Sequence, residues 1–177
     1  MKGIGNFKVI VILALFIVFS LSLSSETELP TENFSLQCRK QIAATLVRST
    51  ATGLSELLKD VSGEQERIKL IQTYVKKIRF YSDNSGYLFV NDNNCVNIAY
   101  PLDINLQGKN LYDHQDIKGK YTFREGAAIA KEGGGFLEYY WVFPGTEKEQ
   151  KKISYIEPIP GTVFWIGAGI YLNADSE

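Results

Sequence analysis

The side chains best suited to hold a small molecule are aromatic residues and one lysine, which recur two positions apart in strand-like segments. Successive side chains of a strand point to opposite faces, so residues two apart share a face. The residues are Tyr87 with Phe89, Tyr139 with Trp141, Lys152 with Ser154, and Tyr100. Hydroxyls, an indole N–H and one ammonium group suit a small carboxylate or an amine-bearing ligand. The alternative, which the pattern alone favours, is that these rings fill the core between sheet and helices.

Residues that could support catalysis or bind a metal are few. The single histidine, His114, lies in the polar segment 112–116, which predicts a solvated loop histidine. The sequence contains neither a nucleophile elbow nor a phosphate-binding loop, and Asp113 and Asp116 lack the other ligands of a calcium loop. We therefore expect no enzyme, no cofactor and no metal site. An enzyme that uses His114 or the acidic loop is the least favoured alternative.

The N-terminal segment has the composition of a secretory signal. Lys2 and Lys8 precede an apolar run over residues 9–23, and small residues up to Ser24 offer a cleavage site. Residues 1–24 are predicted to be a signal peptide, with an uncleaved N-terminal membrane anchor as the alternative. Both interpretations place the rest of the chain outside the cytoplasmic membrane, in the periplasm or another extracytoplasmic space.

The 177 residues fit one domain, and the net charge of −1 gives no basic face for a nucleic-acid partner. Export would permit a disulfide between Cys38 and Cys95. Pairing and two free thiols are equally compatible with the sequence, because it does not show how far apart the two residues lie.

The pattern after the apolar run predicts a polar linker over 25–33 and then two helices. An apolar stripe with steps of three and four residues predicts a long helix over 36–61, weakened and kinked at 48–53. Capping-box spacing at Ser62 opens a second helix that ends near Phe80.

Strand signals follow in the second half of the chain. Alternation and turn residues predict a hairpin and then, after a loop and a helix, three further strands. The strands are expected over 87–90, 95–100, 136–143, 152–158 and 163–171, with a turn at 92–94, a loop over 101–120 and a helix over 122–131 opened by a capping box at Thr122. This order predicts an α+β fold, in which helices pack on an antiparallel sheet of about five strands.

Several short motifs follow one another in order within residues 64–175. They are Ile78-Arg79-Phe80, Gly86-Tyr87-Leu88-Phe89-Val90-Asn91-Asp92, Tyr100-Pro101, Leu106-Gln107-Gly108-Lys109-Asn110-Leu111, Asp116-Ile117-Lys118-Gly119, Gly135-Phe136-Leu137-Glu138-Tyr139-Tyr140-Trp141, Lys152-Ile153-Ser154-Tyr155 and Trp165-Ile166-Gly167-Ala168-Gly169-Ile170-Tyr171. Together they resemble a single Cache domain. The resemblance implies a sensor domain over residues 34–177, with a PAS-like sheet and a long N-terminal helix, that binds small organic ligands, often carboxylates, outside the membrane.

The resemblance also implies which residues form the ligand pocket. Carried over by motif, they are Tyr87, Phe89, Tyr100, Tyr139, Trp141, Lys152 and Tyr155, with Arg79 as a second cation. Tyr155 alternates out of phase with Lys152. Tyr100 stands where the family usually has histidine, so the ligand class stays open.

Two functional hypotheses follow. The first is an exported small-molecule sensor, for a small organic acid or similar metabolite, that lacks its own transducer and works with a membrane receptor or sensor kinase. The second is a structural or interaction module that docks on a membrane receptor and has no free ligand pocket. A homodimer through the N-terminal helix is compatible with either.

Overall fold

The structure, a computed structural model, describes residues 31–172. The predicted signal peptide or anchor and most of the predicted linker lie outside these residues. Helix α2 (Thr31–Leu58) begins inside the predicted linker, 25–33, and residues 36–172 belong to one compact unit. Within the described part of the chain, no helix is long and apolar enough to cross a membrane.

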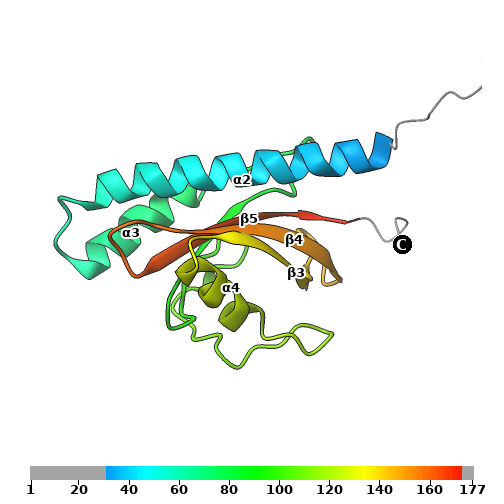
Figure 1. Cartoon of the computed structure of the whole chain (residues 1–177). Helices are drawn as coiled ribbons and strands as arrows, with labels where there is room; N and C mark the ends of the chain where they lie inside the picture. The colour runs from blue at the N-terminus through cyan, green and yellow to red at the C-terminus, as the bar shows by residue number, and fades with distance from the viewer. Residues whose placement is uncertain (1–30, 173–177) are drawn as a thin grey trace, which may run out of the picture. The chain divides into compact units, whose positions relative to one another are not determined.

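The helices differ from the sequence-based expectation at their ends. Helix α2 continues through residues 48–53, where a kink was expected (Figure 1). Helix α3 (Glu64–Val75) has Gly63 as its N-cap, without a side-chain hydrogen bond, so the predicted capping role of Ser62 is wrong. It also ends five residues before Phe80, because Phe80 forms an antiparallel bridge with Gly86 and is therefore extended.

Helix α4 (Thr122–Lys131) has the predicted bounds, but its N-cap is Tyr121 and no side chain caps it. The capping-box role predicted for Thr122 is therefore wrong. The loop before it contains one short 3-10 helix, η1 (Ile104–Leu106).

The strands form one antiparallel sheet, which confirms the predicted fold class. Its spatial order is β2-β1-β5-β4-β3. The strands are β1 (Leu88–Asp92), β2 (Asn97–Ala99), β3 (Gly135–Val142), β4 (Glu149–Pro158) and β5 (Phe164–Tyr171). The predicted hairpin joins β1 and β2, and the Asp92 carboxylate organises its turn by accepting from the backbone N–H groups of Asn94 at 2.9 Å and Val96 at 2.7 Å.

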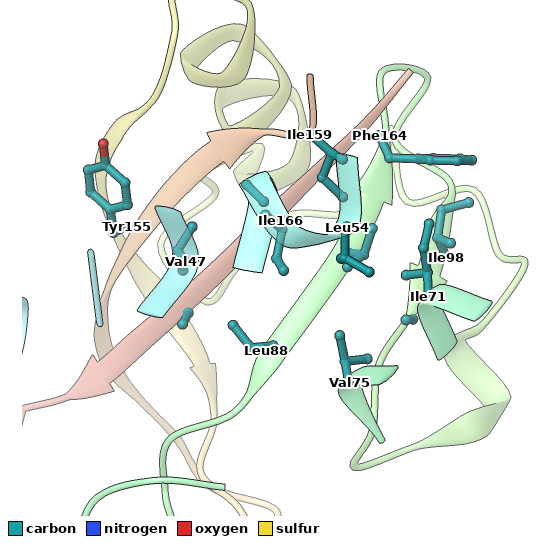
Figure 2. Close-up of a cluster of buried hydrophobic side chains, with 14 of the residues drawn as sticks. Val47, Leu54, Ile71, Val75, Leu88, Ile98, Tyr155, Ile159, Phe164 and Ile166 are labelled. Atoms are coloured by element: carbon teal, nitrogen blue, oxygen red, sulfur yellow. The ribbon is translucent and has the colours of Figure 1, made fainter. Parts of the chain in front are cut away.

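The sheet is covered on both faces by different layers (Figure 1). Helices α2 and α3 lie on one face and build an aliphatic core, in which Val47, Leu54 and Ile71 pack against Leu88 and Ile166 (Figure 2). Helix α4 and the loop before it cover the other face, whose core is largely aromatic. Because strand residues alternate, β1, β4 and β5 contribute to both cores.

The two cysteines have different environments: Cys38 is exposed and Cys95 is buried, and both are free thiols. The structure therefore contains no Cys38–Cys95 disulfide.

The loop over the aromatic face is held by Asp116, which is buried. Its Oδ1 accepts from the backbone N–H groups of Lys118 and Lys120, and its Oδ2 accepts from that of Tyr140 on β3, each at 2.9 Å. Desolvation by burial raises the pKa of this carboxyl, but these three donors outweigh it, so the pKa lies below its ordinary value of 3.8. Asp116 is thus a structural residue that ties the loop to the sheet.

Replacement of Asp116 by asparagine is expected to lower the free energy of unfolding by about 1–3 kcal/mol, since an amide N–H₂ would face one of the three backbone donors. Because the folded-state pKa is depressed, the stabilisation is present above pH 3.8 and is lost as the pH falls through the folded pKa. Denaturant titrations at neutral and acidic pH measure both effects. Asp113→Asn is the matched control, because that side chain is 88% exposed and should change little. Equal stability of the two variants would contradict this role.

Candidate functional site

A cavity lies between the aromatic face of the sheet and its cover of loop and α4. Its volume is about 30 Å³. Its walls are Tyr87, Phe89, Asn97, Tyr100, Leu106, Leu111, Thr122, Phe123, Leu137, Tyr139, Trp141, Lys152, Ile156 and Trp165. Among these described residues one is basic and none is acidic. An apolar wall with a few polar groups is the usual make-up of a small-molecule site.

The basic residue, Lys152, comes from the interior of β4 and is only 1% exposed. Its Nζ donates to the Tyr87 hydroxyl at 2.7 Å and lies 4.1 Å from the centre of that ring and 4.9 Å from the centre of the Tyr171 ring. No acidic side chain among the described residues forms a salt bridge with it. The amine therefore keeps donors that no side chain in this part of the molecule uses.

The electrostatic state of Lys152 follows from its surroundings. Taking an ammonium out of water costs several kcal/mol. Attraction to a ring face contributes about 0.5–2 kcal/mol, which offsets only part of that cost. Burial therefore lowers the pKa of Lys152 well below its ordinary value of 10.5. A carboxylate placed beside the amine would supply the missing negative charge.

The tyrosine hydroxyls around Lys152 form a directed chain of hydrogen bonds. Tyr171 donates to the Val142 carbonyl at 2.7 Å, so Tyr87, 3.0 Å away, must donate to Tyr171 while it accepts from Lys152. Tyr100 accepts from the Trp141 indole N–H at 2.8 Å, which leaves its own hydrogen to a 3.4 Å contact with Tyr87 or to a ligand. Desolvation by burial raises the pKa of the Tyr87 and Tyr100 hydroxyls, so both stay protonated at neutral pH.

Two glycines of β5 make the space in which Lys152 and Phe89 lie. A Cβ on Gly169 would come within 2.8 Å of Lys152 Cε, and a Cβ on Gly167 would come within 2.5 Å of the Phe89 ring. Each approach is closer than van der Waals contact permits. The position of the amine therefore depends on the absence of side chains at these two places.

Six of the eight residues predicted for the pocket line this cavity together: Tyr87, Phe89, Tyr100, Tyr139, Trp141 and Lys152. The structure places the other two elsewhere. Tyr155 lies in the aliphatic core on the opposite face (Figure 2), where its hydroxyl accepts from Arg48 at 2.6 Å and donates to Glu157 at 2.8 Å. The out-of-phase alternation of Tyr155 with Lys152 explains this difference.

Arg79, the predicted second cation, does not reach the cavity. It follows the end of α3, and its guanidinium donates to the backbone carbonyls of Ile78 at 2.7 Å and Pro101 at 3.4 Å. It therefore closes the end of the helix against the loop after β2.

His114 is not the solvated loop histidine that the sequence predicted. Its ring packs against the ring of Trp141, with centroids 5.3 Å apart, and that of Phe123 at 5.5 Å. Its Nδ1 is buried and has no hydrogen-bond partner among residues 31–172. His114 therefore packs against two residues of the cavity wall, Phe123 and Trp141, and is not itself among the wall residues. Within the same residues, no cluster of histidine, cysteine or acidic side chains could hold a metal ion.

Comparison with known proteins shows the family of this chain. A family model described as Cache domain matches residues 30–177. The chain belongs to the Cache domain family. Cache sensor domains bind ligands and are not catalytic, and they are typically periplasmic parts of membrane receptors.

Three relatives of this Cache domain are informative. It is 34% identical over 88 residues to the sensor histidine kinase MctS of Rhizobium johnstonii, a match that covers 50% of this chain and 19% of the kinase. A solved periplasmic sensor domain of a chemotaxis protein is 26% identical with a TM-score of 0.69, covering 78% of this chain and 98% of that domain.

The third relative is a solved structure described as the structural basis for carboxylic acid recognition by a Cache chemosensory domain. It is 25% identical with a TM-score of 0.69, covering 80% of this chain and 98% of that one. The chain spans about a fifth of the length of the curated relatives it matches.

Several residues of the Cache cavity were not predicted as site residues. Tyr171 is one of four rings that surround the Lys152 amine and form a cage, the others being those of Tyr87, Phe89 and Tyr139. Trp165, Asn97 and Phe123 form part of the wall. A usable signal was the alternation of β5, in which Trp165 and Tyr171 share a face with two glycines. Asn97 and Phe123 gave no comparable signal, because the short strand β2 and the helix α4 that carry them reach the cavity only in the folded chain.

Proposed function

We propose that this Cache domain is an exported, non-catalytic sensor module of the single-Cache type that binds a short-chain carboxylate beside Lys152. The observation that carries the proposal is the buried amine of Lys152, which no acidic side chain among the described residues neutralises. We further propose that the domain lies in the periplasm, that its partner is a membrane receptor or a sensor kinase, and that two copies associate along α2.

The chemistry of the cavity supports an anionic ligand. Three polar groups of the wall can donate a hydrogen bond to a ligand: Lys152, the Tyr100 hydroxyl and the Tyr139 hydroxyl, which shares its hydrogen with Ser154 at 3.0 Å. Carboxylate oxygens accept only, so they match this set. The carboxylic acid recognition stated for the solved Cache relative supports the same class.

The size of the cavity supports a short ligand. A volume of about 30 Å³ corresponds to space for about two water molecules on the same measure. An acid with a long or branched chain would have to displace the rings of the wall. We therefore propose one of the shortest carboxylates, acetate or propionate.

The same small volume favours a second candidate function. If the aromatic side chains fill the cavity permanently, the domain is an interaction module that docks on a membrane receptor without a small ligand. The two functions differ in whether an added acid stabilises the isolated domain.

A thermal-shift experiment on residues 25–177 tests the proposal. Short-chain carboxylates at 100 times their dissociation constant are expected to stabilise the folded state by about 2.7 kcal/mol, which raises the melting temperature by several degrees. The uncharged alcohols and amides of the same chain length should give no shift. Arg79→Gln is the control variant and should keep the full response, because that cation lies outside the cavity. No shift with any acid would favour the interaction module.

A further inference from the structure

The empty site and a site that holds a carboxylate favour different protonation states of the Lys152 amine. In the protein without ligand it is almost completely buried, its side-chain partner is the neutral hydroxyl of Tyr87, and no acidic side chain among the described residues forms a salt bridge with it. Such surroundings disfavour the charged ammonium relative to the neutral amine, in line with the depressed pKa of this group. A neutral amine, however, cannot form an ion pair with a carboxylate.

The other titratable groups that face the amine cannot supply the charge. They are the phenols of Tyr87 before β1, Tyr139 on β3 and Tyr171 on β5, and burial raises the pKa of each. The charged groups of the covering layer point away: Arg124 of α4 pairs with Asp113, Glu125 of α4 lies 3.5 Å from Lys120, and Asp116 is held by backbone donors. His114 lies behind Trp141.

We propose that each carboxylate enters the cavity together with one proton, which Lys152 takes up from solvent, so that the complex holds an ammonium–carboxylate pair. The inference rests on the proposed function, because it requires that a carboxylate binds. The step is balanced: the amine gains one proton from the buffer, and no bond of the ligand is made or broken. The site therefore responds to the product of acid concentration and proton concentration.

The pH dependence follows from this coupling. Above the pKa of the empty site, only the protonated fraction of the protein can pair with the anion, and this fraction falls tenfold for each pH unit. The affinity for acetate or propionate is therefore expected to be lower at pH 8 than at pH 6, by at most about tenfold per pH unit. An anion that bound to a permanently charged lysine would show no such dependence in this range.

Isothermal titration calorimetry with acetate and propionate at pH 8, in phosphate and in Tris, measures the proton directly. The observed enthalpy should differ between the buffers by their difference in ionisation enthalpy, with a slope of about one proton per bound acid. Lys151→Met, the matched control, should keep this slope because Lys151 pairs with Glu138 on the sheet surface. His114→Gln should also keep it.

The outcomes separate the two claims. Binding with the same enthalpy in both buffers and the same affinity at pH 6 and pH 8 would overturn proton uptake while carboxylate recognition stands. A slope that disappears in His114→Gln would also overturn it, because the histidine would then be the acceptor. Absence of heat and of thermal shift with every acid at pH 6 would instead remove the proposed function itself.

Discussion

Replacement of Lys152 by methionine is expected to make the empty domain more stable and to abolish carboxylate binding. Methionine keeps the length and apolar stem of the side chain but removes a buried amine whose charged form is disfavoured. Exchange of a buried ionisable group for a hydrophobic one of similar volume is neutral or stabilising by about 1–4 kcal/mol. Loss of the single basic residue among the described wall residues should weaken binding by at least about 30-fold, since breaking such a pair costs about 2–5 kcal/mol.

The sign of the pH dependence provides a second test of Lys152→Met. The folded-state pKa of Lys152 lies below 10.5, so between these two values the unfolded chain binds one proton more than the folded protein. Stability of the natural sequence should therefore rise with pH in this interval, and its deficit relative to the variant should shrink. Denaturant titrations below pH 10, where the phenols are still protonated in both states, measure this difference.

Lys151→Met is again the control for both measurements, because it removes a partly exposed lysine from the neighbouring position. It should change stability by less than about 1 kcal/mol and leave binding intact. If Lys152→Met lowered the stability of the empty domain and left acid binding unchanged, Lys152 would be a structural residue.

Replacement of Gly169 by alanine is expected to damage the site and the fold together. The added Cβ would lie 2.6 Å from the Ile153 carbonyl oxygen and 2.8 Å from Lys152 Cε, so β4 and the amine must move. Overpacking of this kind costs about 1–3 kcal/mol. Displacement of the amine should weaken carboxylate binding by about tenfold or more, because ion-pair geometry is sensitive to small shifts.

Gly53→Ala in α2 separates this steric effect from a general effect of glycine replacement. No atom lies within 4 Å of a Cβ at Gly53, so alanine there should stabilise the helix by about 0.5–1 kcal/mol. Thermal melts and acid titrations of both variants give the comparison. Normal binding in a folded Gly169→Ala protein would show that the strand accommodates the methyl group without moving Lys152.

Much of the fold and the faces of the strands could be predicted from alternation. It paired Tyr87 with Phe89 and Tyr139 with Trp141, and both pairs line the cavity. It also argued against Tyr155, which was included because of its motif and lies in the opposite core. Helix ends were less predictable, because the bridge between Phe80 and Gly86 that limits α3 is a contact formed by tertiary structure.

The candidate site was harder to predict where it depends on convergence in space. The cage around Lys152 joins side chains from three strands, and the packing of His114 on Trp141 brings a loop onto the sheet. Neither arrangement has a local sequence signature. Arg79 shows the opposite case, in which a suitable charge in a suitable motif is used for backbone contacts at a helix end.

The division of the sheet into two unlike layers has a consequence for how such domains can diversify. On β5, Trp165, Gly167 and Gly169 belong to the aromatic side, whereas Ile166 and Ala168 belong to the aliphatic side. On this one strand, the odd-numbered residues therefore shape the cavity and the even-numbered residues pack against the helices. Substitutions that fit on the cavity side of β5 can change ligand preference, whereas the residues between them hold the helix-packed scaffold, so recognition and architecture are divided between alternate residues of one strand.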